Sequence, residues 1–179
     1  MLLCEKGVQN MKIEAEDLIE FHCPRWEELP EIELYVDQVV SILQKNLIIF
    51  AKDKETQVIT SSMINNYVKK DILNSPIKKK YNREHLAKLF VICICKKIMS
   101  ISEIGESIES MQKAYSVEEG YNIFCKELEK SIKQAFDYTN KKHDFPLEEE
   151  TRELATLKAI TTAFANTVLV DRLIMMRNK

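Results

Sequence analysis

The sequence predicts an all-α protein, in which a helix-turn-helix with a small basic wing precedes a C-terminal helical bundle with a long last helix. Three observations lead to this fold class. Only three Gly and four Pro occur in 179 residues, so few residues interrupt helices. Leu, Ile, Lys and Glu are frequent, and these residues favour helix. Apolar residues recur at three- and four-residue steps in several segments, which is the spacing of one helix face.

The N-terminal region, residues 1–30, is expected to form an arm followed by a connector. Its first part is polar and has a weak helical period. Trp26 and Leu29 are expected to attach the connector to the core. Residues 31–50 then repeat apolar side chains at helical spacing, which predicts an amphipathic helix with Pro30 near its start.

The starts of the following helices are marked by residues that can cap them. These caps are Thr60 or Ser61, Asn82, Ser100 with Glu103, and Ser116 with Glu119. The first of these helices is short and should end before Pro76. After Pro146, residues 147–177 contain no helix breaker and predict a long last helix.

Three regions are therefore expected: residues 1–30, a helix-turn-helix over 31–113, and a C-terminal region over 114–179. The last helix is more apolar than one face of a monomer needs. We expect it to form a homodimer interface. A small-molecule effector pocket in this bundle is a less favoured alternative, and its lining would come from Phe136, Phe164, Met175 and Met176.

Charge is unevenly distributed along the chain. The formal net charge is -2, yet residues 60–100 hold nine Lys or Arg against Asp71 and Glu84, which gives +7. The remainder of the chain then carries -9. Such asymmetry is typical of nucleic-acid contact, although an ordinary lysine-rich surface is the simpler alternative.

The stretch MINNYVKKDILNSPIKKKY, residues 63–81, contains the candidate DNA-binding residues. It predicts a recognition helix over about 61–71, with apolar side chains inward and an outer face free of acid, and a basic wing over 76–81. Asn can pair with the adenine edge, and Lys and Ser can contact phosphates. Bases are expected to face Ser62, Asn65 and Asn66, and phosphates to face Lys69, Lys70, Lys78, Lys79, Lys80 and Arg83.

Other classes of function have weaker support. The sequence has no Gly-rich phosphate loop, no Gly-x-Ser-x-Gly motif and no His-Glu-x-x-His motif, so an enzyme is not expected. His22 beside Cys23 is a conceivable pair of base and nucleophile. Cys93 and Cys95 would point away from each other on a helix, which favours core packing over a metal site. No metal or cofactor is expected.

The location expected for the chain is the cytoplasm. The longest fully apolar run, LFVICIC at 89–95, is far too short to span a membrane, and no signal peptide is apparent. The five cysteines have irregular spacing, which fits reduced thiols better than a disulfide framework.

Residues 63–108 resemble the winged helix-turn-helix of MerR-type regulators. The matching positions are Ile64 and Tyr67 on the helix, Ile72 and Leu73 at its exit, Lys79 and Tyr81 in the wing, Leu86 and Leu89 on the next helix, and Ser100, Glu103 and Ile104 after it. Asn65 and Asn66 replace an Arg and a Tyr of that pattern, and the wing lacks its Gly. The resemblance implies duplex DNA as partner and pairing through long C-terminal helices.

A more specific resemblance is to the uncharacterised bacterial family called domain of unknown function 1836. The stretches RWEELPEIELYVDQV and MINNYVKK with KKKYNREHLAKL are similar to that family, and the likeness covers roughly residues 24–110 and much of the tail. It implies a fold and assigns no activity. The function expected from the sequence is a DNA-binding transcriptional regulator; the alternative is a helical adaptor whose basic face docks an acidic protein.

Overall fold

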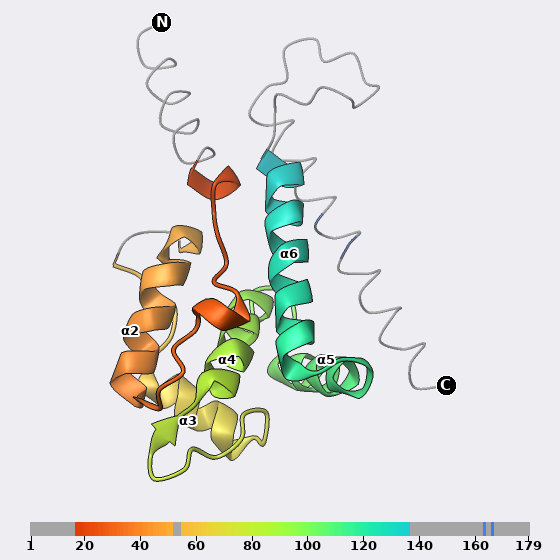
Figure 1. Ribbon diagram of the computed structural model, residues 1–179. Helices are drawn as coiled ribbons and strands as arrows, with labels where there is room; N and C mark the ends of the chain where they lie inside the picture. Colours follow the sequence, from red (N-terminus) through yellow and green to blue (C-terminus); the bar gives the residue numbers. More distant parts are fainter. Residues whose placement is uncertain (1–16, 52–54, 137–162, 164–165, 167–179) are drawn as a thin grey trace, which may run out of the picture. The chain divides into compact units, whose positions relative to one another are not determined.

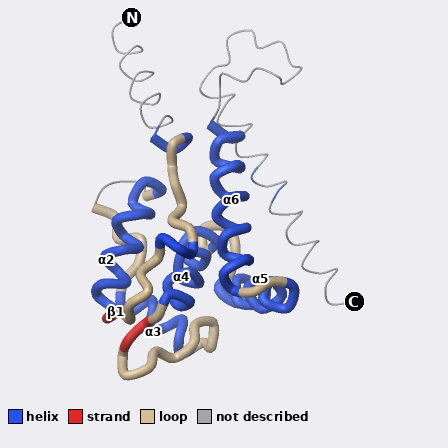
Figure 2. Tube along the Cα trace, in the orientation of Figure 1, coloured by secondary structure: helices blue, strands red, loops and turns tan. Residues whose placement is uncertain are grey.

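The computed structural model describes residues 17–51 and 55–136, together with Ala163 and Asn166. By its contacts the chain divides into Met1–Tyr138 and Thr139–Lys179. The first unit is mostly helical, as the sequence predicted, and it also contains a small two-stranded sheet that an all-α class does not include (Figures 1 and 2).

The first unit contains five α-helices, two short 3-10 helices and two short strands that lie wholly among its described residues. In chain order they are η1 (Trp26–Glu28), β1 (Leu34–Tyr35), α2 (Val36–Leu47), η2 (Ile48–Phe50), α3 (Ser61–Lys69), β2 (Lys80–Tyr81), α4 (Arg83–Cys95), α5 (Ile101–Ala114) and α6 (Val117–Phe136). The strands β1 and β2 are antiparallel, with Leu34 opposite Tyr81 and Tyr35 opposite Lys80.

Helix α4 lies at the centre of the unit and packs against α2, α5, α6 and β2 (Figure 1). Eight of its residues are buried, from His85 to Phe90 and at Ile92 and Cys93. A helix that is apolar on nearly every side belongs in a core, whereas α2, α3, α5 and α6 are each apolar on one side. Cys93 lies in this core and Cys95 packs against it, as predicted for both cysteines.

The helix predicted over residues 31–50 begins later than expected. Residues Leu34 and Tyr35 are extended because they pair with Tyr81 and Lys80, so α2 starts at Val36. Tyr35 is its N-cap, and the Tyr35 backbone N–H donates to Gln38 Oε1 at 2.9 Å. Pro30 therefore lies in the connector and not at the start of the helix.

The predicted helix caps are confirmed. Thr60 Oγ1 accepts from the Met63 N–H at 3.2 Å, and Asn82 Oδ1 accepts from the His85 N–H at 3.1 Å. The reciprocal Ser–Glu pairs form at both predicted places: the N–H of Ser100 donates to Glu103, the N–H of Ser116 donates to Glu119, and each Ser hydroxyl accepts in return. These four starts place α3, α4, α5 and α6.

Several predictions lie outside the described residues. They are residues 1–16 of the N-terminal arm, the long helix over 147–177, the dimer interface expected on it, and most of the proposed effector pocket. Among the described residues, no helix is both long enough and apolar enough to cross a lipid bilayer.

Candidate nucleic-acid interface

Helix α3 separates its apolar and polar residues as the sequence predicted. Ile64 and Tyr67 are buried, and Met63 and Val68 are partly buried against the core. The opposite side carries no acid and is exposed to solvent; it comprises Ser62, Asn65, Asn66, Lys69 and Lys70. The helix therefore presents amide, hydroxyl and ammonium groups together, while two large side chains hold it in the unit.

Helix α3 ends in a turn that fixes where Lys70 lies. The Ile72 N–H donates to the Tyr67 carbonyl at 3.1 Å, and the Asp71 N–H donates to the Val68 carbonyl at 3.1 Å. This pair of bonds is a Schellman motif, in which the residue after the C-cap adopts a left-handed conformation. That residue is usually Gly, but here it is Asp71, with φ 56°.

A second left-handed segment forms the tip of the predicted wing. The Lys80 N–H donates to the Ile77 carbonyl at 2.9 Å, and Lys78 and Lys79 both have positive φ, at 51° and 64°. This is a type I′ turn, which normally contains Asn-Gly because both central residues need φ above zero. We call Ile77–Lys80 the basic turn. It exposes two lysines at a backbone conformation that lysine disfavours.

Four of the residues predicted to contact phosphates have ammonium groups without a partner among the described residues. The side chains of Lys69, Lys70, Lys78 and Lys79 are exposed, and within the described part of the chain none has an ion-pair or hydrogen-bond partner. Their charge is therefore available to a polyanion. Together with Ser62, Asn65 and Asn66 they form what we call the α3–turn surface.

Lys80 and Arg83 are placed differently from those four lysines. Lys80 Nζ lies 3.8 Å from Glu33 Oε2 and 5.8 Å from the centre of the Tyr35 ring. Arg83 Nη2 lies 3.1 Å from Glu31 Oε1, and the Arg83 side chain is 18% exposed. Both cations already face carboxylates, so they attach the base of the turn to the connector.

The remaining cations of the +7 segment also have internal roles. Lys88 Nζ lies 3.2 Å from Glu84 Oε1 on α4. Lys96 donates to the Val58 carbonyl and Lys97 donates to the Phe50 carbonyl, which ties the end of α4 to the segments on either side of residues 52–54. These three lysines thus take part in contacts within the unit.

Acidic residues border the α3–turn surface on two sides. Glu31 and Glu33 lie beside the base of the turn through their pairs with Arg83 and Lys80. At the other end, a groove of about 590 Å³ includes Lys70 in its lining together with the acids Asp71, Glu106 and Glu109. The cationic surface without neighbouring acids is therefore limited to α3 and the tip of the turn.

His85 lies under the loop that carries the basic turn, and its side chain is buried. Its Nδ1 accepts from the Asn82 backbone N–H at 3.2 Å, and its ring packs edge-on against Tyr81 with centroids 5.5 Å apart. Nε2 is buried and has no hydrogen-bond partner among the described residues. Burial is the main cause that lowers the pKa of His85, and the charge of Lys88 lowers it further. The nearby backbone of Asn74 and Ser75 and the carboxylate of Glu84 raise this pKa by a smaller amount.

This lowered pKa predicts a loss of stability in mild acid. The unfolded chain, with an ordinary His pKa of about 6.5, binds the proton more readily than the folded one. The contribution of His85 to the free energy of unfolding should therefore be constant above about pH 6.5 and decrease as the pH falls below it. His85→Gln keeps an acceptor for the Asn82 N–H and should reduce this decrease between pH 7.5 and 5.5, measured by urea unfolding. An equal decrease in both proteins would contradict the assignment to His85.

The two residues considered as a nucleophile pair are separated by their surroundings. His22 is exposed, and its ring nitrogens contact carboxylates, with Nε2 2.7 Å from Glu28 Oε2 and Nδ1 3.2 Å from Glu129 Oε1. Cys23 is fully buried beside Cys125, and its hydrogen bond with that thiol, together with burial, raises the pKa of Cys23. Among the described residues no group of three or more His, Cys, Asp or Glu is placed to hold a metal ion.

Comparison with known proteins identifies a family and gives no further relative. No curated protein and no solved structure matches the chain. A family model described as a domain of unknown function (DUF1836) matches residues 24–138, which extend from the connector through α6. That match covers more than half of the chain and includes all of the α3–turn surface, and it agrees with the resemblance seen in the sequence. The chain belongs to the DUF1836 family.

Proposed function

We propose that the chain binds duplex DNA through the α3–turn surface and acts as a transcriptional regulator. The observation that carries the proposal is the group of four exposed, unpaired lysines on α3 and the basic turn. They accompany two asparagines and a serine on an acid-free helix face. Asn is a bidentate partner for adenine in the major groove, and lysines neutralise phosphates beside it.

The proposal further assigns α2 and α3 to a helix-turn-helix of the MerR type. Helix α2 precedes α3, and the basic turn and β2 follow it, which is the order of a recognition helix and its wing. Residues 48–60 separate α2 from α3, a longer connection than the usual three or four residues. In this proposal Asn65 and Asn66 face bases, and a homodimer through the C-terminal helices reads a two-fold site.

The salt dependence of binding tests the proposal. Each neutralised phosphate releases condensed counterions, so four contacts predict a slope of about -3.5 for log K against log salt when one protomer binds, and about -7 when both protomers of a dimer contact the duplex. Affinity for a random duplex of about two helical turns should then fall about 100-fold between 50 and 200 mM salt for one bound protomer, and by more for a dimer. Fluorescence anisotropy of a labelled duplex gives this slope directly.

The same titration separates the DNA-binding function from an adaptor function. A slope near zero, or no binding at the lowest salt, would rule out phosphate recognition by these lysines. In that case the α3–turn surface would be assigned to an acidic protein partner.

A further inference from the structure

The connector and the residues that follow it as far as β1, which together span residues 22–35 and are called the connector from here on, contact two parts of the unit that are far apart in the sequence. Its first half lies on α6, and its second half includes β1, which pairs with β2 directly after the basic turn. Leu29, which follows η1, and Leu34, which is in β1, are buried in the core. The connector is therefore a fixed segment with attachments at both ends.

At the α6 end, the main attachment is Glu129. Arg25 donates to both oxygens of its carboxylate, Nη1 to Oε1 at 2.8 Å and Nη2 to Oε2 at 2.6 Å. The Cys23 backbone N–H also donates to Oε1, at 2.9 Å. Burial alone would raise the pKa of Glu129, but these hydrogen bonds outweigh it and hold the pKa below its ordinary value. A bidentate Arg–carboxylate pair fixes orientation as well as distance.

Two more hydrogen bonds bring the connector backbone to the same helix. The Trp26 N–H donates to Asn122 Oδ1 at 2.9 Å, and the Tyr121 hydroxyl donates to the Pro24 carbonyl at 2.8 Å. Asn122 and Glu129 lie about two turns apart on one side of α6, and Tyr121 adjoins Asn122. Three consecutive connector residues, from Pro24 to Trp26, are thus held by α6.

At the turn end, the attachments reach the base of the basic turn. The Trp26 ring lies 5.6 Å from the guanidinium carbon of Arg83, which also pairs with Glu31. Glu33 and Tyr35 both contact Lys80, and Tyr35 lies opposite Lys80 in the sheet. Lys80 is the last residue of the turn, directly after Lys78 and Lys79. Trp26 is shared by both ends, since its backbone binds α6 and its ring contacts Arg83.

We propose that residues 22–35 act as a strap that couples the position of α6 to the position of the basic turn. The Arg25–Glu129 pair is the joint of the strap with α6. The chain continues from α6 into the C-terminal unit, so an event there that shifts α6 also shifts Lys78 and Lys79 relative to α3. The strap gives a physical route for regulating the α3–turn surface, and only this regulatory consequence rests on the proposed DNA binding.

Glu129→Ala tests the strap when amide hydrogen exchange is followed by mass spectrometry. Loss of the joint should speed exchange in peptides covering residues 77–82 by about fivefold or more, a usual size for coupling between sites. Peptides from α3 should exchange as in the wild type. Glu127→Ala is the matched control, because Glu127 is an exposed partner of Lys130 on the same helix and does not contact the strap. It should leave both sets of peptides unchanged.

Arg25→Lys provides a second variant if Glu129→Ala does not fold. It retains the positive charge but cannot form the two parallel bonds, so it should also speed exchange at 77–82. Unchanged exchange at 77–82, or equally faster exchange in α3, overturns the strap. Parallel anisotropy measurements keep the two proposals separate, since a wild-type chain that does not bind DNA refutes the function while exchange still decides the coupling.

Discussion

Replacing Lys78 with Asn and Lys79 with Gly is expected to stabilise the fold and weaken DNA binding at the same time. Both lysines have left-handed backbone conformations, which cost an L-residue with a β-carbon about 1–2 kcal/mol each. Asn and Gly adopt the type I′ turn more readily. Gly loses more conformational freedom on folding than Lys, which offsets part of this relief of strain. We therefore expect the free energy of unfolding to rise by about 1–2 kcal/mol in total.

The loss of DNA affinity follows from the two removed charges. Through counterion release, each phosphate contact raises the binding constant roughly eightfold at 0.1 M salt. Losing two contacts should therefore lower the affinity for DNA on the order of 50-fold. The slope of log K against log salt should also become less negative by about 2. Urea unfolding and anisotropy measure the two effects separately. A disfavoured backbone retained where charge is presented is the pattern expected of a functional segment.

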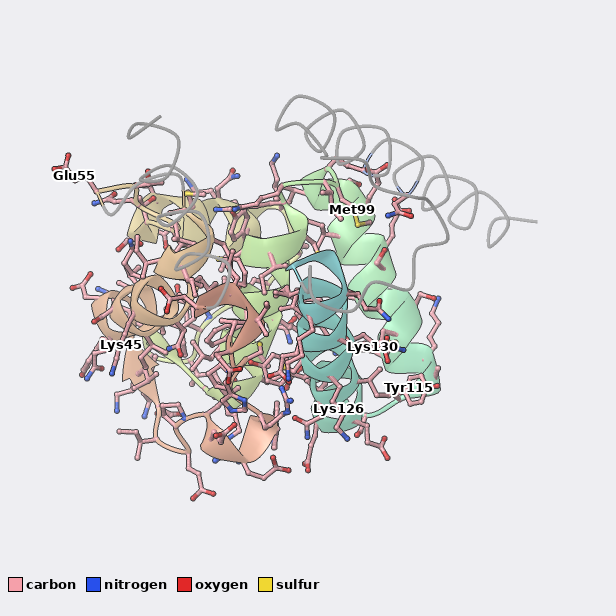
Figure 3. The ribbon with its side chains drawn as sticks, turned by 90° about the horizontal axis from the view of Figure 1, so that it is seen from above. Lys45, Glu55, Met99, Tyr115, Lys126 and Lys130 are labelled. Atoms are coloured by element: carbon pink, nitrogen blue, oxygen red, sulfur yellow. The ribbon has the colours of Figure 1, made fainter. Side chains whose placement is uncertain are left out.

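A matched variant with the same change in charge is Lys45→Gln with Lys126→Gln. Both lysines are exposed, and they lie on α2 and α6, outside the α3–turn surface (Figure 3). Because neither lysine belongs to the α3–turn surface and exposed charges are screened over about 10 Å at 0.1 M salt, affinity should change by less than about threefold. Equal losses in the two double variants would show a response to net charge alone. Reduced stability of the turn variant would contradict the assigned backbone strain.

The features predicted from the sequence are those determined by local interactions. The caps Thr60, Asn82, Ser100 and Ser116 each act on a residue three positions later, so the sequence alone indicates them. The buried positions Ile64 and Tyr67 follow from the helical repeat in the same way. Local spacing was enough to locate α3 and its exposed face.

The features that were not predicted depend on pairs distant in the sequence. Strand β1 forms because Leu34 meets Tyr81, and no pattern within residues 31–50 indicates that partner. Likewise, Lys80 and Arg83 look like free cations until folding brings Glu33 and Glu31 beside them. The six basic candidates therefore appeared equivalent in the sequence, whereas in the structure four are free and two hold the connector. The joint between Arg25 and Glu129 joins residues still further apart in the sequence.

Ile64→Ala is expected to give the largest loss of stability among the changes considered. Helix α3 has nine residues, and a helix of that length is unstable alone in water, so its side chains must hold it. Ile64 is fully buried within the core. Removing its side chain beyond the β-carbon forfeits apolar burial and leaves a cavity, which together cost about 2–5 kcal/mol. That is a large share of the roughly 5–15 kcal/mol that stabilises a typical domain. The midpoint of urea unfolding should fall accordingly.

The neighbouring residue provides a control that separates stability from recognition. Asn65 is exposed on the same helix, so Asn65→Ala should change the free energy of unfolding by no more than about 0.5 kcal/mol. If Asn65 pairs with a base, the same variant should lose about 1–3 kcal/mol of discrimination for its preferred duplex. The substitution of Ile64 should therefore reduce stability, and that of Asn65 should reduce DNA recognition, although the two residues are adjacent. A large loss of stability in Asn65→Ala, or none in Ile64→Ala, would mean that the inward and outward faces of α3 are assigned incorrectly, and the α3–turn surface would no longer hold.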